Sequence, residues 1–225
     1  MKIQWLGHSC FKLSESTGTS IITDPYDSEI VGYSMPKGIN SDIVTVSHSH
    51  KDHSSLKEIE GEYILLNAPE NLEVKGVTIV GYNTFHDNAQ GLKRGSNIIF
   101  KYRIDGLDVC HMGDIGEDCN ADIVNDITPV DVLMIPVGGK YTIDAEKAKA
   151  YVDALMPDIV IPIHYKTKDC DLDIDKIDSF IKLFDAEDII EVDDDNITID
   201  RDEVCHKKTK VYILRKKNIT IFFKI

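Results

Sequence analysis

The most informative stretch of this sequence is Ile43-Val44-Thr45-Val46-Ser47-His48-Ser49-His50-Lys51-Asp52-His53. It begins as an apolar, β-branched run and passes directly into three histidines and an aspartate. The chain has only eight histidines in 225 residues, so three within six positions argue against the alternative of an ordinary polar surface loop. A divalent metal needs neutral imidazoles and carboxylates that converge from fixed backbone positions. The stretch therefore predicts a metal site at a strand end.

The spacing within this stretch allows it to supply ligands to two adjacent metals. Side chains alternate along an extended strand, so His48 and His50 point the same way. If the chain turns after the strand, Asp52 and His53 face a second point close to the first pair. One segment is therefore expected to supply ligands to two adjacent metals.

Three further candidates each follow an apolar run that reads as a strand: His86, Asp114 and His164. Ligand-binding groups gather at such strand ends in sheets with helical connections. A single histidine beside a strand is more often a hydrogen-bonded structural residue. Together with the first stretch, however, the candidates make five histidines and two aspartates. That set is sufficient for two metals bridged by Asp114.

These residues occur in the order of a known set of motifs. The motifs are Asp24 in Ile22-Thr23-Asp24-Pro25, the H-x-H-x-D-H signature at 48–53, His86, Gly113-Asp114 and His164. Over residues 1–200 the chain resembles the metallo-β-lactamase superfamily. The opening Trp5-Leu6-Gly7-His8-Ser9-Cys10, the segment 136–142 and the segment 161–165 are similar to the branch that contains ascorbate-6-phosphate lactonase.

The resemblance implies an α/β fold, a four-layer αββα sandwich with a dinuclear metal site at one edge of the two sheets. By the motif positions, one metal is expected on His48, His50 and His86. The second metal is expected on Asp52, His53 and His164, with Asp114 as the bridge. Asp24 is expected to orient a ligand histidine through its free ring nitrogen.

The activity implied by the resemblance is that of a metal-dependent hydrolase. Two divalent ions, zinc before manganese or iron, would share a bridging hydroxide that attacks a small ester, lactone or phosphodiester-type substrate. Asp52, Asp114 and His8 are the expected catalytic residues. The chain has no G-x-S-x-G nucleophile elbow, which fits a mechanism without a serine nucleophile.

Five residues are candidates for contact with the substrate, and each has a plainer alternative as a solvated or turn residue. They are Lys93, Arg94, Lys140, Tyr141 and Lys166. Glu117 stands where many relatives in this branch carry a histidine shortly after the Gly-Asp pair. This difference leaves the rim of the pocket open and does not affect the expected metal ligands.

The hydrophobic pattern predicts many strands in the first half and then a strand–helix–strand arrangement. Strands are expected over 3–6, 11–13, 20–23, 43–47, 63–66, 77–82, 97–103, 107–111, 130–136 and 159–163. Apolar residues at helical spacing predict helices over 144–155 and 173–184. Residues 1–225 are expected to form a single domain, with 206–225 as a basic C-terminal hairpin made by the strands 210–214 and 219–224.

Composition limits the partners. The net charge of −14 opposes nucleic acid, and no apolar run reaches the roughly 18 residues that would insert into a membrane. Residues 206–225 are the exception, with seven basic residues and no acidic ones. Five cysteines without framework spacing favour a reducing cytoplasm. The expected partner is a small-molecule substrate, and a homo-oligomer is an open alternative.

Three other functions are compatible with parts of the sequence. A redox enzyme of the di-iron reductase or sulfur dioxygenase type would use the same fold, although di-iron reductases typically replace the second histidine of the pair, here His50, with glutamate. A nuclease is opposed by the acidic body of the chain. A non-catalytic metal-binding protein is opposed by the complete ligand set.

Overall fold

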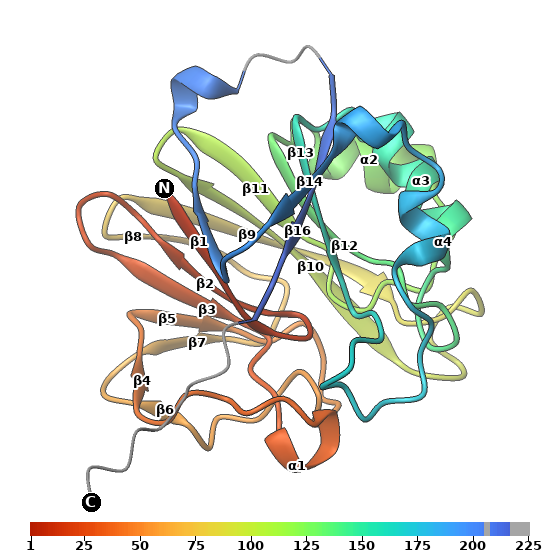
Figure 1. Cartoon of the computed structure of the whole chain (residues 1–225). Coiled ribbons are helices and arrows are strands. Elements are labelled where there is room, and N and C mark those ends of the chain that lie inside the picture. The colour runs from red at the N-terminus through yellow and green to blue at the C-terminus, as the bar shows by residue number, and fades with distance from the viewer. Residues whose placement is uncertain (205–207, 217–225) are drawn as a thin grey trace, which may run out of the picture.

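Two β-sheets packed against each other form the centre of the molecule (Figure 1). The computed structural model describes residues 1–204 and 208–216. The first sheet has the spatial order β15 (Asn196–Thr198), β1 (Lys2–Gly7), β2 (Cys10–Ser14), β3 (Ser20–Thr23), β5 (Ile43–Thr45) and β7 (Ile64–Leu66). The second has the order β14 (Ile189–Val192), β16 (Lys210–Leu214), β13 (Ile159–Ile163), β12 (Val132–Pro136), β11 (Leu107–His111), β10 (Ser96–Ile104), β9 (Val77–Phe85) and β8 (Asn71–Val74). The short strands β4 (Ile39–Asn40) and β6 (Ile59–Glu60) pair with each other.

Helices cover the outer face of the second sheet, as Figure 1 shows for α2 (Ala121–Ile127), α3 (Ala145–Leu155) and α4 (Asp178–Ile181). The described first half of the chain adds one short helix, α1 (Ser28–Val31). Single 3₁₀ turns occur at Ala186–Asp188 and Arg201–Glu203. The expected α/β sandwich of two sheets with helices outside is confirmed, although its helices are few.

The central strands of the second sheet are apolar on both faces because each face packs against a different layer. In β12, Val132 and Met134 belong to the core between the sheets, while Leu133 and Ile135 pack in the core under the helices. Successive side chains of a strand point to opposite faces, so a strand covered on both sides must be apolar throughout. The continuous runs in the sequence were therefore correctly predicted to be buried strands.

Helix α3 follows the sequence pattern closely. The Asp144 carboxylate accepts a hydrogen bond from the backbone N–H of Lys147 at 3.0 Å, which caps the first turn. Ala148, Val152 and Leu155 are buried on the face toward the sheet. The helix ends just before Pro157, as the sequence predicts.

The second predicted helix, over 173–184, is wrong for its first half. Only Asp178–Ile181 is helical. The N–H of Asp175 donates to the carbonyl of Gly138 at 2.8 Å, and its own carbonyl accepts from the N–H of Lys166 at 2.8 Å. These long-range backbone bonds hold the segment extended and use the groups that a helix would need internally.

The C-terminal strand lies inside the second sheet. Strand β16 coincides with the predicted strand 210–214 and runs parallel to both of its neighbours, β13 and β14. The second strand of the predicted hairpin, 219–224, falls outside the described residues. Within the described ranges no helix has the length and apolar character needed to cross a bilayer.

A buried hydrogen bond between the sheets gives a test of the packing. The Thr45 hydroxyl of β5 lies 2.7 Å from the Tyr102 hydroxyl of β10, and both side chains are fully buried. In Thr45→Val the tyrosine hydroxyl loses this partner, so we expect the free energy of unfolding to fall by about 1–3 kcal/mol. The double variant Thr45→Val/Tyr102→Phe removes both polar groups and should recover part of that loss. Urea denaturation of the three proteins measures the effect, and a single variant as stable as the native chain would contradict it.

Candidate metal centre

Six strands, three from each sheet, deliver polar side chains to one edge of the sandwich. In the first sheet β1, β3 and β5 run in the same direction, because β2 is antiparallel to β1 and β3 while β5 is parallel to β3. In the second sheet β9, β11 and β13 share one direction for the same reason. The residues that follow these strand ends are His8, Asp24, His48 to His53, His86, Asp114 and His164.

Asp114 lies at the centre of the resulting cluster. Its Oδ2 is 3.3 Å from His86 Nε2 and 3.8 Å from His48 Nε2. On the other side, His164 Nε2 lies 3.2 Å from Oδ2 and His53 Nε2 lies 3.1 Å from Oδ1. One carboxylate therefore contacts histidines from two separate groups, which is the position that the sequence assigns to a bridging residue.

The first group consists of His48, His50 and His86. One ligand nitrogen from each of these residues lies within 4.8 Å of those of the other two. The His48 ring is 4.7 Å from the ring of His50 and 4.7 Å from that of His86, measured between centroids. The structure thus brings together the three residues expected to hold one metal.

The second group consists of His8, Asp52, His53 and His164, again with ligand atoms within 4.8 Å of one another. Asp52 Oδ2 lies 3.5 Å from His53 Nε2 and 3.9 Å from His164 Nε2. These are the three residues expected at the second metal. His8 joins them, although the sequence had suggested only a catalytic role for it.

The buried polar atoms of the cluster are short of partners. Atoms with no hydrogen-bond partner among the described residues are Nδ1 and Nε2 of His8, Nε2 of His48, Nε2 of His53, Nδ1 of His86, Oδ1 of Asp114, and Nδ1 and Nε2 of His164. Buried polar groups are otherwise nearly always hydrogen-bonded. Unpartnered imidazoles gathered around carboxylates fit a divalent cation, for which nitrogen and carboxylate oxygen are both suitable ligands.

Burial prepares several of these histidines for metal binding. Desolvation is the main cause that lowers the pKa of His8 to about 4, that of His48 to about 3 and that of His86 to about 4. Because a metal ligand must be neutral imidazole, these residues need not lose a proton near neutral pH before they bind an ion.

The carboxylates of Asp52 and Asp114 make the cluster favourable for a positive charge. Burial disfavours the charged form of His53, but Asp114 and Asp52 raise its pKa well above the ordinary value. Burial also disfavours the Asp114 carboxylate, yet His164 and His53 hold its pKa well below the usual range. An ionised, buried carboxylate among histidines is a site that a cation would stabilise.

Asp24 orients one of these histidines. Its Oδ2 lies 2.8 Å from His53 Nδ1 and accepts a bond from the Ser47 hydroxyl at 2.6 Å, while Oδ1 accepts from the Ser47 N–H at 2.7 Å. The carboxylate thereby turns His53 Nε2 toward Asp114. This is the positioning role that the sequence predicts for Asp24.

Several residues that position the cluster were not predicted from the sequence. Asn97 Oδ1 accepts the N–H of Asp114 at 2.9 Å. A Cβ on Gly116 would lie 2.4 Å from the carbonyl carbon of His86, and a Cβ on Gly138 would lie 2.1 Å from the carbonyl oxygen of His164. The sequence offered a signal for Asn97, because an asparagine inside an otherwise apolar strand is unusual. It offered none for the two glycines, whose contacts depend on tertiary structure.

Backbone conformation is also unusual around the cluster. His8, Asp24 and His164 all have positive φ angles, of 53°, 40° and 51°. Non-glycine residues adopt this region at an energetic cost, and such residues concentrate at functional sites. Each of the three is the first residue after its strand, so the positive φ redirects the chain at the strand end.

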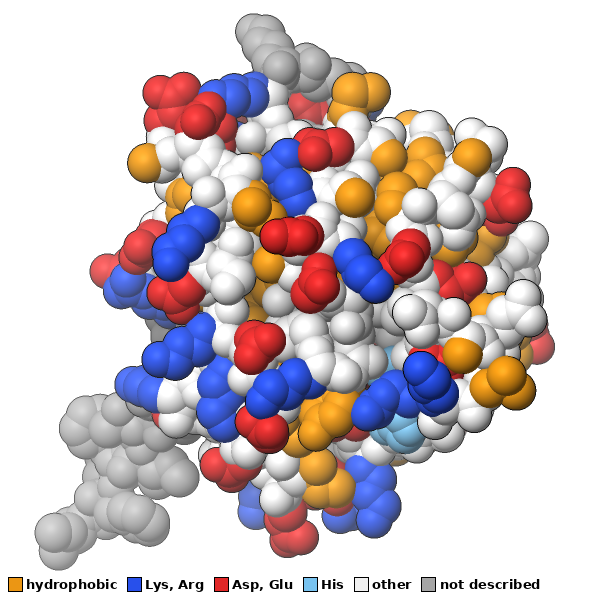
Figure 2. Space-filling model, turned by 90° about the vertical axis from the view of Figure 1, so that its right-hand side faces the viewer, with side chains coloured by type: hydrophobic (Ala, Val, Ile, Leu, Met, Phe, Trp, Pro, Cys, Tyr) orange, Lys and Arg blue, Asp and Glu red, His pale blue; other side chains and the backbone are white. Residues whose placement is uncertain are grey.

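A cavity of about 250 Å³ opens onto the cluster. It is lined by Ile30, His50, Lys51, Asp52, His86, Arg94, Asp114, Tyr141 and Leu172. The Arg94 guanidinium lies over the Tyr141 ring, 4.4 Å from its centroid. Figure 2 shows a small patch of histidine at the surface with Lys and Arg side chains beside it. The lining of the cavity holds two cations, Lys51 and Arg94, beside the carboxylates of Asp52 and Asp114.

The other substrate candidates are engaged elsewhere or lie outside this cavity. Lys140 pairs with Asp173 at 2.6 Å, and Lys166 donates to the carbonyl of Leu172 at 2.7 Å. Lys93 is not among the lining residues. Glu117 accepts the N–H of Phe85 at 2.7 Å, so its carboxylate secures the strand end that precedes His86.

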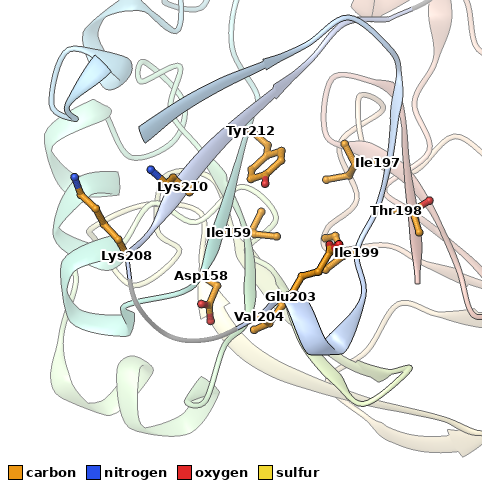
Figure 3. Close-up of a pocket in the computed structure, with 10 residues that line it drawn as sticks. All are labelled: Asp158, Ile159, Ile197, Thr198, Ile199, Glu203, Val204, Lys208, Lys210 and Tyr212. Atoms are coloured by element: carbon orange, nitrogen blue, oxygen red, sulfur yellow. The ribbon is translucent and has the colours of Figure 1, made fainter. Parts of the chain in front are cut away.

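A larger cavity, of about 390 Å³, lies at the other end of β13 (Figure 3). It is lined by Asp158, Ile159, Ile197, Thr198, Ile199, Glu203, Val204, Lys208, Lys210 and Tyr212. Asp158 precedes β13 and His164 follows it, so a strand of about 17 Å separates this cavity from the metal cluster. It contains no histidine among the described residues, whereas His50, His86 and Asp114 line the smaller cavity.

Comparison with known proteins agrees with this geometry. Residues 2–164 match the family model of the beta-lactamase superfamily domain. A UPF0173 metal-dependent hydrolase from Methanosarcina mazei is 28% identical over 198 residues, covering 75% of this chain and 85% of the relative. A similar protein from Thermoplasma acidophilum is 28% identical over 193 residues, with the same coverage.

A solved structure is more similar still in sequence. A Thermotoga maritima protein, assigned as a Zn-dependent hydrolase of the metallo-β-lactamase superfamily, is 36% identical to this chain. It matches with a TM-score of 0.78 over 95% of this chain and 97% of its own length. The similarity therefore extends over both sheets.

The role of Asp24 can be tested by substitution. In Asp24→Asn an amide NH₂ replaces an oxygen that accepts from Ser47 and contacts His53. The His53 ring then loses its fixed orientation, and we expect divalent metal affinity to fall about 10–100-fold. Competition with a chelator measures the affinity. Asp131→Asn, a change at a buried aspartate that accepts the N–H of Asp108 at the start of β11, should leave metal affinity unchanged. Equal affinities in Asp24→Asn and the native protein would contradict the assignment.

Proposed function

Because this chain belongs to the metallo-β-lactamase superfamily and is a metal-dependent hydrolase, we propose that it hydrolyses a small anionic ester, lactone or phosphodiester with two divalent ions. The observation that carries the proposal is Asp114, whose carboxylate contacts histidines of both the first and the second group. A residue in this position is suited to bridge two cations.

The proposed ligands follow the two groups. His48, His50 and His86 would hold one ion, and Asp52, His53 and His164 would hold the other, with Asp114 between them. Two bound divalent ions supply an ionised water at neutral pH and polarise the scissile oxygen. Zinc fits the histidine-rich set best, and manganese or iron is the alternative.

The remaining chemistry falls to residues that face the cavity. Asp52 lines it, and 19% of its side chain is exposed, so it can both touch bound substrate and exchange a proton with water. The Asp52 pKa is lowered, because His53 and His8 outweigh the effect of burial. The carboxylate is therefore ionised and can accept a hydrogen bond from the attacking water, which orients that water toward the substrate.

The substrate class is proposed from the cavity mouth. Arg94 and Lys51 are cations in a chain of net charge −14, and both line the cavity. Asp87 accepts backbone N–H bonds from Lys93 at 2.9 Å and from Arg94 at 2.8 Å, which fixes the loop that presents Arg94. Ile30 and Leu172 supply an apolar wall. A phosphate or carboxylate on a partly apolar molecule matches this lining.

The alternatives carry less support. His50 stands in the first group, where the di-iron reductase pattern has glutamate, and the named relatives are hydrolases. The acidic body opposes a nuclease. A reducing cytoplasm remains our prediction for the location, since the four described cysteines are unpaired.

Metal dependence tests the proposal directly. We expect chelator-treated protein to hydrolyse none of a panel of lactones, esters and phosphodiesters, and zinc or manganese to restore turnover of at least one class. The measurement is initial rate against added metal. If no reconstituted sample hydrolyses any compound in the panel, or if chelation leaves the rate unchanged, the proposal fails.

Arg94 tests the substrate class. In Arg94→Gln the positive charge at the cavity mouth is lost, and charge-assisted bonds to an anion are lost with it. We expect kcat/KM for an anionic substrate to fall about 10–100-fold and kcat/KM for a neutral analogue to change less than about threefold. Arg103→Gln, which removes the same charge at the opposite end of β10, is the matched control. A uniform loss for both substrates would argue against recognition of an anion by Arg94.

A further inference from the structure

The backbone around His8 is held by several contacts, although His8 lies outside the expected set of metal ligands. It follows β1 directly, and Trp5 Nε1 donates to its carbonyl oxygen at 2.9 Å. The preceding Gly7 has no room for a side chain, since a Cβ there would lie 2.7 Å from the Tyr26 hydroxyl. The backbone is thus fixed on both sides of a histidine that has a positive φ of 53°.

The His8 side chain is buried, and both of its ring nitrogens lack a hydrogen-bond partner among the described residues. A histidine that serves only to pack normally satisfies at least one ring nitrogen. His111 shows the contrast, because its Nε2 lies 2.8 Å from the Ser9 carbonyl oxygen and its Nδ1 accepts the N–H of Gly113. The unsatisfied ring of His8 therefore points to a partner that the protein atoms do not provide.

The position of the ring identifies that partner. His8 Nε2 is 3.6 Å from Asp52 Oδ2, the same oxygen that lies 3.5 Å from His53 Nε2 and 3.9 Å from His164 Nε2. Ligand atoms that are each about 2.1 Å from a tetrahedral ion lie roughly 3.4 Å apart. The three imidazoles surround Asp52 Oδ2 at close to this spacing.

We infer that His8 Nε2 is a direct ligand of the second metal, which is thereby held by His8, Asp52, His53 and His164. This inference rests on the proposed two-metal function and adds a ligand to it. It also makes the two sites unequal. The second has four ligands of its own besides the bridging Asp114, whereas the first has three histidines besides that bridge.

The residues that line the cavity agree with this difference between the two metal sites. His50 and His86 of the first group line the cavity, whereas of the second group Asp52 lines it and the three histidines do not. Each further protein ligand leaves an ion fewer positions for water or substrate, and catalytic sites keep a position open. A first metal on three histidines and Asp114 would therefore keep more room for substrate than a second metal on His8, Asp52, His53, His164 and Asp114.

A direct test is the position of the ion in crystals of the native protein loaded with zinc. We expect anomalous diffraction at the zinc edge to place the second ion about 2.0–2.1 Å from His8 Nε2. A separation above about 3 Å would overturn the inference and leave His8 as a positioning neighbour of Asp52. This measurement does not depend on whether any variant folds.

Zinc titration of His8→Gln provides a second readout. We expect the variant to bind one ion like the native chain and the other more than about 100-fold more weakly, which exceeds the usual loss of an outer partner. Ser9→Ala is the matched control, because the Ser9 hydroxyl is buried beside His8 and belongs to neither group. Two ions bound within threefold of native affinity in His8→Gln would contradict the inference.

These results can be separated from the fate of the proposed function. If the native protein binds two ions and hydrolyses its substrate while His8 lies away from both, only the His8 assignment fails. If the native protein binds no second ion, the two-metal proposal fails and the assignment fails with it.

Discussion

The structure depends on one buried negative charge. The Asp114 carboxylate is buried and has four imidazole Nε2 atoms within 3.8 Å. Among the described residues, no Lys or Arg forms an ion pair with it. Burying such a charge costs free energy that must be offset locally. Two divalent ions held between the carboxylate and its histidines, as we propose for this centre, would offset that cost.

The fold serves this constraint by directing six strands to one edge. Each sheet contributes three strand ends, and short polar residues behind them fix the ligands. Asn97 Oδ1 accepts a hydrogen bond from the N–H of Asp114, and Asp24 Oδ2 contacts Nδ1 of the His53 ring. Gly113 allows another close approach, since a Cβ there would lie 2.4 Å from Asn97 Oδ1. Small residues at this edge therefore let the backbone approach the polar side chains closely.

The sequence predicted the strands and most of the cluster residues, because hydrophobic runs and the residues that follow them are local features of the chain. Apolar runs ending in His or Asp marked the strands and the ligands that follow them, and the motif order predicted the family, which the comparisons confirm. The helix expected over 173–184 was mostly wrong, because backbone bonds to Gly138 and Lys166 outweighed its helical spacing. The place of His8 in the second group could not be foreseen either. It depends on how far the end of β1 lies from Asp52, which is a property of the packed sheets.

Counting the metal ions tests this account most directly. Elemental analysis of the native protein, reconstituted with zinc and dialysed against metal-free buffer, should give two equivalents of zinc per chain. In the variant Asp114→Ala, which removes the shared carboxylate, the same procedure should retain one equivalent or none. A native protein that keeps less than one equivalent, or an Asp114→Ala variant that still keeps two, would contradict the central claim.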